Sequence, residues 1–319
     1  MVHDASVPCE VAATYGLHPI SAERLPGGWV NDSWRTDCSE GTFVVCRYGG
    51  LGATRRRLLY EHAVMTHAAA RLREVRAPLR GPCDSTLLER DGAFFAVMPY
   101  VPGTTGRRDP GARPGAAQLC ARFHRAMSDG FLREGAAISS ARVLRRLAER
   151  FAAFARDRLV GRKLDWPAAI AVTRAAAERL RSGPHQPLTV AHGDVHPANF
   201  VWNRSEVVGL IDFDFARAAE RTYDVAIAMD EFGRASNATP LDVAAAVDFA
   251  RHYDSAANMT PAERRTLPDL MVRRDASMLW YIVTRHGRRG AGDVGNAAVF
   301  IDRLREIDRL REQIQEALA

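Results

Sequence analysis

The chain has 319 residues, which is enough for one large domain or for two lobes with separate cores. Hydrophobic residues make up 47% and charged residues 26%, the composition of a soluble globular protein, and the five widely spaced cysteines include no C-x-x-C pair, which argues against a disulfide framework or a zinc site. The formal charge of +6 is dispersed, and the basic runs at 55–57 and 285–289 are short and contain no aromatic residues, so we expect no binding to nucleic acid.

The first hundred residues are predicted to be rich in strands. Residues 33–36 and 42–47 form two strands joined by a turn at 37–41, and a third strand at 93–98 follows the turn signal Asp91-Gly92. A helix with an imperfect apolar face lies between them, at about 54–73. These elements predict a small antiparallel sheet with one helix.

A connector follows, because two prolines and a glycine occur within residues 98–103. The chain is then mainly helical, with helices expected at 116–127, 141–157, 167–180, from about Tyr223, and at 296–319. Strands at 200–202 and 207–211 form a hairpin within this part. We therefore predict an α+β fold of two lobes, at 1–98 and 104–319, joined by a connector at 99–103.

The segment from Val190 to Phe200, followed by Leu210-Ile211-Asp212-Phe213-Asp214, contains the residues that point to chemistry. Asp194 and Asn199 have the Asp-to-Asn spacing of the kinase catalytic loop H-R-D-x-x-x-x-N, and Asp212 follows a strand as the metal-binding Asp of D-F-G does. Phosphoryl transfer needs a carboxylate that orients the attacking hydroxyl and oxygen ligands that hold Mg²⁺, and Asp and Asn supply both.

The two-part motif H-G-D-x-H-x-x-N and I-D-F-D resembles the aminoglycoside phosphotransferase and choline kinase superfamily, which includes homoserine-kinase-like members. The resemblance implies a protein-kinase-like fold, with a nucleotide-binding lobe at 1–98, a hinge at 99–103, and a catalytic and substrate lobe at 104–319. It also implies that Asp194 is the catalytic base and that Asn199 and Asp212 bind Mg²⁺, with ATP or GTP as phosphate donor. It further implies that His192 braces the loop and that His196 lies near the phosphates or shapes the turn. Asp224 matches a family Asp that supports the catalytic loop.

The resemblance extends from about Gly16 to Ala228. Gly27 and Gly28 resemble the family's short nucleotide hairpin, and an ordinary hairpin explains a Gly-Gly turn equally well. The stretch from Leu119 to His124 resembles the family's L-x-x-L-H helix, with Phe123 in place of the second Leu, and we interpret it as core packing with one satisfied histidine.

Arg47 occupies the position of the strand lysine that protein kinases use to bind phosphates, and Glu61 on the next helix is its expected partner. An exposed strand arginine and a solvated helix acid are the structural alternative. The adenine pocket is expected to be lined by Val45, Met98 and Phe213, with backbone hydrogen bonds from Tyr100 and Val101.

Four alternatives are weaker. His192 and His196 have the spacing of a helical zinc site, but Gly193 and Pro197 disrupt a helix. Asp212 and Asp214 as a glycosidase pair would leave Asp194 and Asn199 unexplained. A degenerate kinase fold that acts as a binding or regulatory module is disfavoured because Asp194, Asn199 and Asp212 are all present. A protein kinase is disfavoured because no activation segment ends in A-P-E.

We expect the acceptor to be a small molecule: first an antibiotic or other natural product, and second homoserine or a related amino alcohol. Residues that could contact it are acidic or aromatic: Asp214, Glu220, Asp230, Glu231, Trp280 and Tyr281. Each is explained equally well as a surface acid or core aromatic. The sequence has no apolar run long enough for a membrane helix and no signal peptide at residues 1–16, so we expect a cytoplasmic protein. The oligomeric state is not predicted.

Overall fold

The computed structural model describes residues 6–26, 31–49, 53–129, 139–156, 164–184, 186–286 and 294–319. Contacts between residues divide the chain into two compact units. The first comprises Met1–Thr105 together with Phe200–Asp214, and the second comprises Gly106–Asn199 together with Phe215–Ala319. The chain leaves the first unit two residues after the predicted hinge at 99–103.

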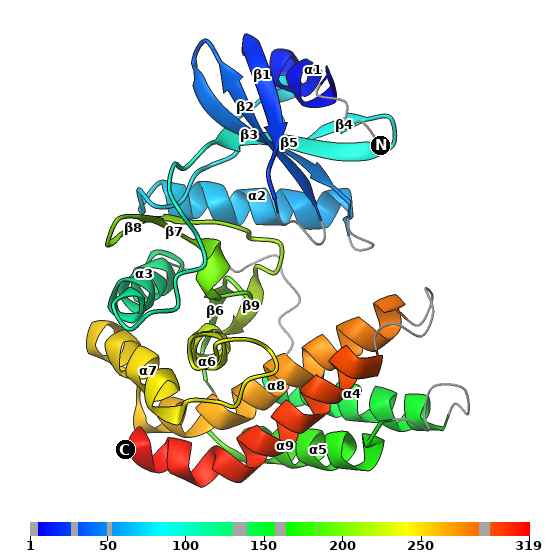
Figure 1. Ribbon diagram of the computed structural model, residues 1–319, viewed down its shortest axis with the longest axis vertical. Coiled ribbons are helices and arrows are strands. Elements are labelled where there is room, and N and C mark those ends of the chain that lie inside the picture. The colour runs from blue at the N-terminus through cyan, green and yellow to red at the C-terminus, as the bar shows by residue number, and fades with distance from the viewer. Residues whose placement is uncertain are drawn as a thin grey trace. The chain divides into compact units, whose positions relative to one another are not determined.

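The first unit contains a five-stranded antiparallel sheet with the strand order β1-β2-β3-β5-β4. Its elements, shown in Figure 1, are α1 (Ser6–Thr14), β1 (Pro19–Arg24), β2 (Asp32–Cys38), β3 (Gly41–Tyr48), α2 (Arg55–Ala69), the 3₁₀ turn Pro82–Asp84, β4 (Leu88–Arg90) and β5 (Ala93–Pro99). The sheet and α2 confirm the predicted N-terminal architecture. Neither α1 nor β1 was predicted.

The two faces of the sheet are covered by different helices. Val45 and Val97 pack with Val11 and Ala12 of α1, whereas Cys46 packs with Leu58 of α2 on the other face. Successive side chains of a strand point to opposite faces, so residues 43, 45 and 47 of β3 lie on the α1 face and residues 44, 46 and 48 lie on the α2 face. This alternation decides which strand residues can meet α2.

The hairpin of β7 (Phe200–Asn203) and β8 (Glu206–Leu210) belongs to the first unit. Thr104 and Trp202 exchange two backbone hydrogen bonds, of 2.9 and 2.8 Å, and the Leu210 N–H donates to the Glu74 carbonyl oxygen at 2.9 Å. Gly103, with φ at +155°, allows this approach, since a Cβ there would lie 2.4 Å from the Trp202 carbonyl oxygen.

The second unit is mainly helical, as predicted. Its elements are α3 (Ala112–Ala126), α4 (Ser140–Ala155), α5 (Trp166–Ser182), β6 (Leu188–Ala191), the 3₁₀ turn Pro197–Asn199, β9 (Arg217–Glu220), α6 (Arg221–Phe232), α7 (Val243–Ala257), α8 (Pro261–His286) and α9 (Val294–Ala317). Helices α4, α5, α8 and α9 pack against one another, and α6 packs against α7, α8 and the short strand β6 (Figure 1). None of the described helices combines the length and apolar character that a membrane span requires.

Candidate active site

The loop between β6 and the Pro197–Asn199 turn carries the candidate base. Gly193 in this loop has φ at +81°, and a Cβ there would lie 2.2 Å from the Phe215 carbonyl oxygen, so only glycine fits. The loop is closed by backbone hydrogen bonds from the His196 N–H to the Asp194 carbonyl, at 3.0 Å, and from the Asn199 N–H to the His196 carbonyl, at 2.9 Å. The predicted Asp, His and Asn of the motif therefore share one compact turn.

The Asp194 carboxylate is partly exposed, at 29%, and two side chains of its own loop contact it. His196 Nε2 lies 3.2 Å from Oδ2, and Asn199 Nδ2 donates to the same oxygen at 3.2 Å. Burial by itself raises the pKa of Asp194, but the hydrogen bond and charge of His196, with the charges of His192 and Arg274, outweigh burial and lower it. Asp194 is thus ionised at neutral pH and able to accept a proton.

Asn199 and Asp212 are the predicted metal ligands. Asn199 is buried, and its Nδ2 donates to the Asp194 carbonyl oxygen at 2.9 Å, an orientation that leaves Oδ1 as an acceptor. Asp212 is exposed and has φ at +64°, a region that few non-glycine residues occupy and that is associated with functional sites. An amide oxygen and a carboxylate are donors that suit Mg²⁺, so the residues fit the metal. Asn199 belongs to the second unit and Asp212 to the first.

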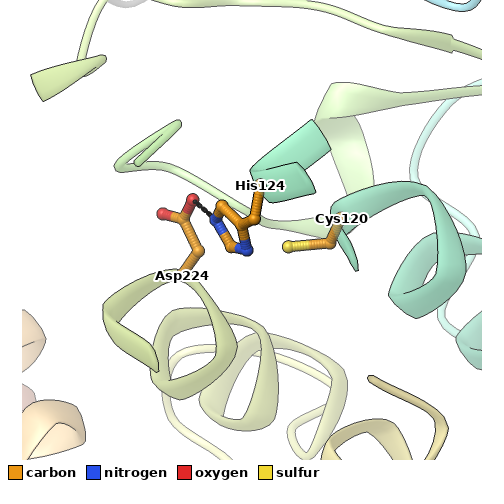
Figure 2. Close-up of side chains that lie close together, drawn as sticks. All are labelled: Cys120, His124 and Asp224. Carbon is orange, nitrogen blue, oxygen red and sulfur yellow. Dashed lines mark hydrogen bonds and ion pairs between the residues drawn. The ribbon is translucent and has the colours of Figure 1, made fainter. Parts of the chain in front are cut away.

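Asp224 of α6 anchors the loop that carries the candidate base. Its side chain is fully buried and accepts backbone N–H groups of His192 and Gly193, at 2.7 and 2.8 Å, as well as His124 Nε2 at 2.9 Å (Figure 2). Burial raises the pKa of Asp224, but the hydrogen bond and charge of His124, together with His192 and the Gly193 N–H, more than offset burial and lower it. A buried, charged acceptor therefore fixes the loop that presents Asp194.

His124 of α3 links this anchor to α7, because its Nδ1 lies 2.8 Å from the Tyr253 hydroxyl. Cys120, His124 and Asp224 have ligand atoms within 4.8 Å of one another, close enough to hold a metal ion (Figure 2). However, both nitrogens of His124 and both oxygens of Asp224 already have hydrogen-bond partners, and burial and the Asp224 charge raise the pKa of the Cys120 thiol. The cluster is a positioning network.

The predicted pair of Arg47 and Glu61 is wrong as a contact. Arg47 lies on the α1 face of β3, with its Nη1 3.9 Å from Asp32 Oδ2. Glu61 is buried on the other face, where its Oε1 accepts the Tyr48 hydroxyl at 3.4 Å. The physical reason is strand alternation, because the β3 residues that face α2 are Cys46 and Tyr48.

The same alternation separates two residues predicted to line an adenine pocket. Val45 is completely buried under α1, whereas Met98 pairs with Val44 and packs beside Cys46 on the α2 face. The two cannot line one pocket, and the prediction that groups them is wrong.

Of the other residues predicted to contact the nucleotide, Tyr100 and Val101 directly follow β5, and Phe213 follows β8. The Tyr100 N–H donates to the Thr42 carbonyl at 3.0 Å, so it is not available to a base, and Val101 packs against Gly209. Phe213 is buried. Gly27 and Gly28 lie outside the described residues.

The acids predicted to contact the acceptor have partners within the chain. Asp214 accepts the Asn31 side-chain amide at 2.7 Å in the first unit. In the second unit Glu220 accepts the Ser140 hydroxyl at 2.6 Å. Asp230 and Glu231 are buried and belong to an arginine network, described next.

Four arginines and four acids form this network within the second unit. Arg234 and Arg303 bind Asp230, Arg274 binds Glu231 and Asp275, and Arg108 lies 3.5 Å from Glu231. The full set is Arg108, Asp230, Glu231, Arg234, Arg274, Asp275, Arg303 and Glu306. The four positive charges balance the four negative charges, so the acids of this network are already paired with arginines of the chain. Arg274 also acts electrostatically on Asp194. No motif in the sequence indicated Arg274 or Tyr253.

The aromatic candidates of α8 also have structural surroundings. Trp280 packs against Phe151 and Phe154, with ring centroids 6.4 Å apart in both cases, and Arg150 lies over its ring at 5.1 Å. Tyr281 is half-buried on the same helix. Trp280 is therefore part of an aromatic cluster of α4 and α8.

Comparison with known proteins identifies the family. Residues 21–261 match the family model described as the phosphotransferase enzyme family, APH. The chain belongs to this family. It is thus a small-molecule kinase, as the motif predicted, with an antiparallel-sheet N-terminal part and a mainly helical C-terminal part.

Known proteins resemble the chain in sequence or in fold. A homoserine kinase of Bradyrhizobium diazoefficiens is 26% identical over 270 residues, which cover 83% of this chain and 79% of the relative. The solved structure of an amicoumacin kinase with AMP-PNP and Ca²⁺ has a TM-score of 0.70 at 12% identity and covers 98% of this chain and 94% of its own. A choline/ethanolamine kinase family protein of Mesorhizobium loti has a TM-score of 0.69 at 16% identity, with 98% of each chain covered.

Proposed function

We propose that this phosphotransferase moves the γ-phosphoryl group of ATP or GTP to a hydroxyl of a small molecule, with Asp194 as catalytic base. The observation that carries the proposal is the loop from Ala191 to Asn199. It presents an ionised, partly exposed carboxylate that Asn199 orients and that the buried Asp224 holds in place. This is the arrangement that positioning and proton acceptance in phosphoryl transfer require.

In the proposed mechanism the Asp194 carboxylate accepts the proton of the acceptor hydroxyl as the hydroxyl oxygen attacks the γ-phosphorus. The bond between the γ-phosphorus and the bridging oxygen breaks, and ADP or GDP leaves with that oxygen. The Asn199 amide keeps the carboxylate directed toward the acceptor, and Asn199 and Asp212 are the residues that would hold Mg²⁺. Mg²⁺, when bound, neutralises the charge that develops on the phosphate oxygens. A lowered pKa keeps Asp194 in the proton-accepting form throughout the neutral range.

We propose a hydroxylated natural product as the first candidate for the acceptor, with antibiotic inactivation as the biological role. A fold neighbour that is an amicoumacin kinase supports this candidate. The commitment of Asp230 and Glu231 to arginines argues against a polycationic acceptor bound by these acids.

The second candidate is homoserine or a related amino alcohol. Two observations favour it: the relative of 26% identity is a homoserine kinase, and an acceptor with a single ammonium group does not need the acids that the arginines occupy.

The test is acceptor-dependent release of ADP or GDP in the presence of Mg²⁺. The acceptor panel spans natural-product antibiotics, homoserine, choline and other amino alcohols. Asp194→Asn is the inactive variant, and Asp248→Asn, an exposed acid of α7, is the matched control. Release that depends on one acceptor class and disappears only in Asp194→Asn supports the proposal. Tight Mg-nucleotide binding without release on any acceptor would favour a binding or regulatory module.

A further inference from the structure

The face of β3 that is directed toward Glu61 carries a cysteine and a tyrosine. Kinases of this architecture pair a strand lysine with a helix glutamate and use the lysine to bind the α- and β-phosphates. Here the alternation of β3 puts Cys46 and Tyr48 on the α2 face, and Arg47 on the opposite face. The strand therefore offers no positive charge to Glu61.

Glu61 is buried, with 5% of its surface exposed, and lacks a full set of partners. Its Oε1 accepts the Tyr48 hydroxyl at 3.4 Å, but its Oε2 has no hydrogen-bond partner among the described residues. A buried carboxylate oxygen without a hydrogen-bond partner destabilises the folded chain unless a cationic group lies near it. Asp212 and Asp214, whose charges act on Glu61 and on Cys46, show that Glu61 lies on the side of the first unit where the proposed metal ligand is found.

Arg57 is the cation next to Glu61. The two residues are four apart on α2, and side chains at this spacing are neighbours on one helix face. Arg57 is exposed, makes no ion pair with any described residue, and is the positive charge that acts on Glu61. The segments of the first unit outside the description, residues 1–5, 27–30 and 50–52, contain neither lysine nor arginine.

We propose that Arg57 on α2, and not Arg47 on β3, supplies the charge that contacts the nucleotide phosphates, in place of the missing strand lysine. The inference rests on the proposed function, since it assumes that the chain binds a nucleotide. An arginine suits the role because its guanidinium grips phosphate oxygens in a bidentate way, and its length allows it to act from the helix one turn before Glu61. The strand position is then free to be the small, uncharged Cys46.

The experiment measures Mg-ATP and Mg-GTP binding directly, by calorimetric titration of the full chain, for the wild type and for three variants. Arg57→Gln removes the proposed charge, Arg57→Lys keeps it, and Arg47→Gln is the matched control, since Arg47 is also a partly exposed arginine of the first unit. Melting curves check that each variant is folded.

We expect Arg57→Gln to weaken nucleotide binding by about tenfold or more, the usual effect of losing a charge-assisted hydrogen bond. Arg57→Lys, which keeps the charge but not the bidentate grip, should lose less affinity than Arg57→Gln, and Arg47→Gln should bind like the wild type. Unchanged binding by Arg57→Gln, or an equal loss in Arg47→Gln, would overturn the inference and leave the proposed function intact. A wild type that binds neither nucleotide would overturn the proposed function, and the inference with it.

Discussion

Replacing Asp224 by Asn tests the account of how the catalytic loop is held. The carboxylate is completely buried and accepts three hydrogen bonds, from His192 N, Gly193 N and His124 Nε2, at 2.7, 2.8 and 2.9 Å. Asn has the same size, but it has no charge and its NH₂ group would face a donor. Breaking a buried, hydrogen-bonded charge pair typically costs about 3–5 kcal/mol. We expect Asp224→Asn to lower the free energy of unfolding by that amount.

The assay combines urea unfolding with turnover. The loss is a large share of the roughly 5–15 kcal/mol that stabilises a typical domain, so the unfolding midpoint should shift clearly. Because the loop that carries Asp194 loses its anchor, kcat should fall even at temperatures where the variant stays folded. Asp248→Asn, which alters an exposed acid, is the control and should change neither quantity.

The pH dependence supplies a second check. The pKa of Asp224 is lowered in the folded chain, so its stabilising effect is present above the ordinary carboxyl pKa and is lost as the pH falls below that value. The difference in stability between wild type and Asp224→Asn should therefore shrink on acidification. A variant within about 1 kcal/mol of the wild type at neutral pH, well below the cost of a broken buried pair, with unchanged kcat, would refute the anchor role.

Three further predictions concern Asp212, Glu61 and Trp280. Asp212→Ala should abolish Mg²⁺-dependent nucleotide binding, and a variant whose affinity for nucleotide in the presence of Mg²⁺ equals that of the wild type would remove Asp212 from the metal site. Burial and the charge of Asp214 raise the pKa of Glu61 from 4.5 to about 8. The wild type should therefore lose stability as the pH rises between these values, whereas Glu61→Gln should not. Equal pH profiles of the two proteins in urea unfolding would contradict this prediction. Trp280→Ala should lower the free energy of unfolding by about 2–3 kcal/mol, which is less than the loss for a fully buried aromatic side chain, and should leave the KM of the acceptor unchanged. A raised KM at unchanged stability would place Trp280 in the acceptor site.

The sequence predicted the family, the fold class and most of the longer elements. Helices α4 and α9 were predicted because their apolar residues recur at helical spacing, α5 because a proline suits its first turn, and the hairpin of β7 and β8 because a polar turn separates two apolar runs. The hairpin's membership of the first unit depends on the backbone pairing of Thr104 with Trp202, which no local pattern encodes. The edge strand β1 is largely exposed and polar, so it has no alternation to detect.

The errors at the site also have physical causes. The contact between Arg47 and Glu61 was inferred from residue type and order. Successive side chains of a strand point to opposite faces of the sheet, however, and Arg47 lies on the same face as Val45. The free acids expected at the acceptor site were paired by Arg234, Arg274 and Arg303, which come from distant parts of the chain. Likewise, the His124 and Tyr253 contact spans 129 positions. Pairings over such separations are set by packing of the helices.

The most direct test of the central claim is the turnover of Asp194→Asn on the acceptor that the panel identifies, measured beside its affinity for Mg-nucleotide. We expect kcat to fall by about 10²- to 10⁴-fold, the usual contribution of a positioned base, while nucleotide affinity and the unfolding midpoint stay close to those of the wild type. Near-normal turnover of a folded Asp194→Asn protein would contradict it, because the phosphoryl group would then be transferred without the carboxylate on which the proposed mechanism depends.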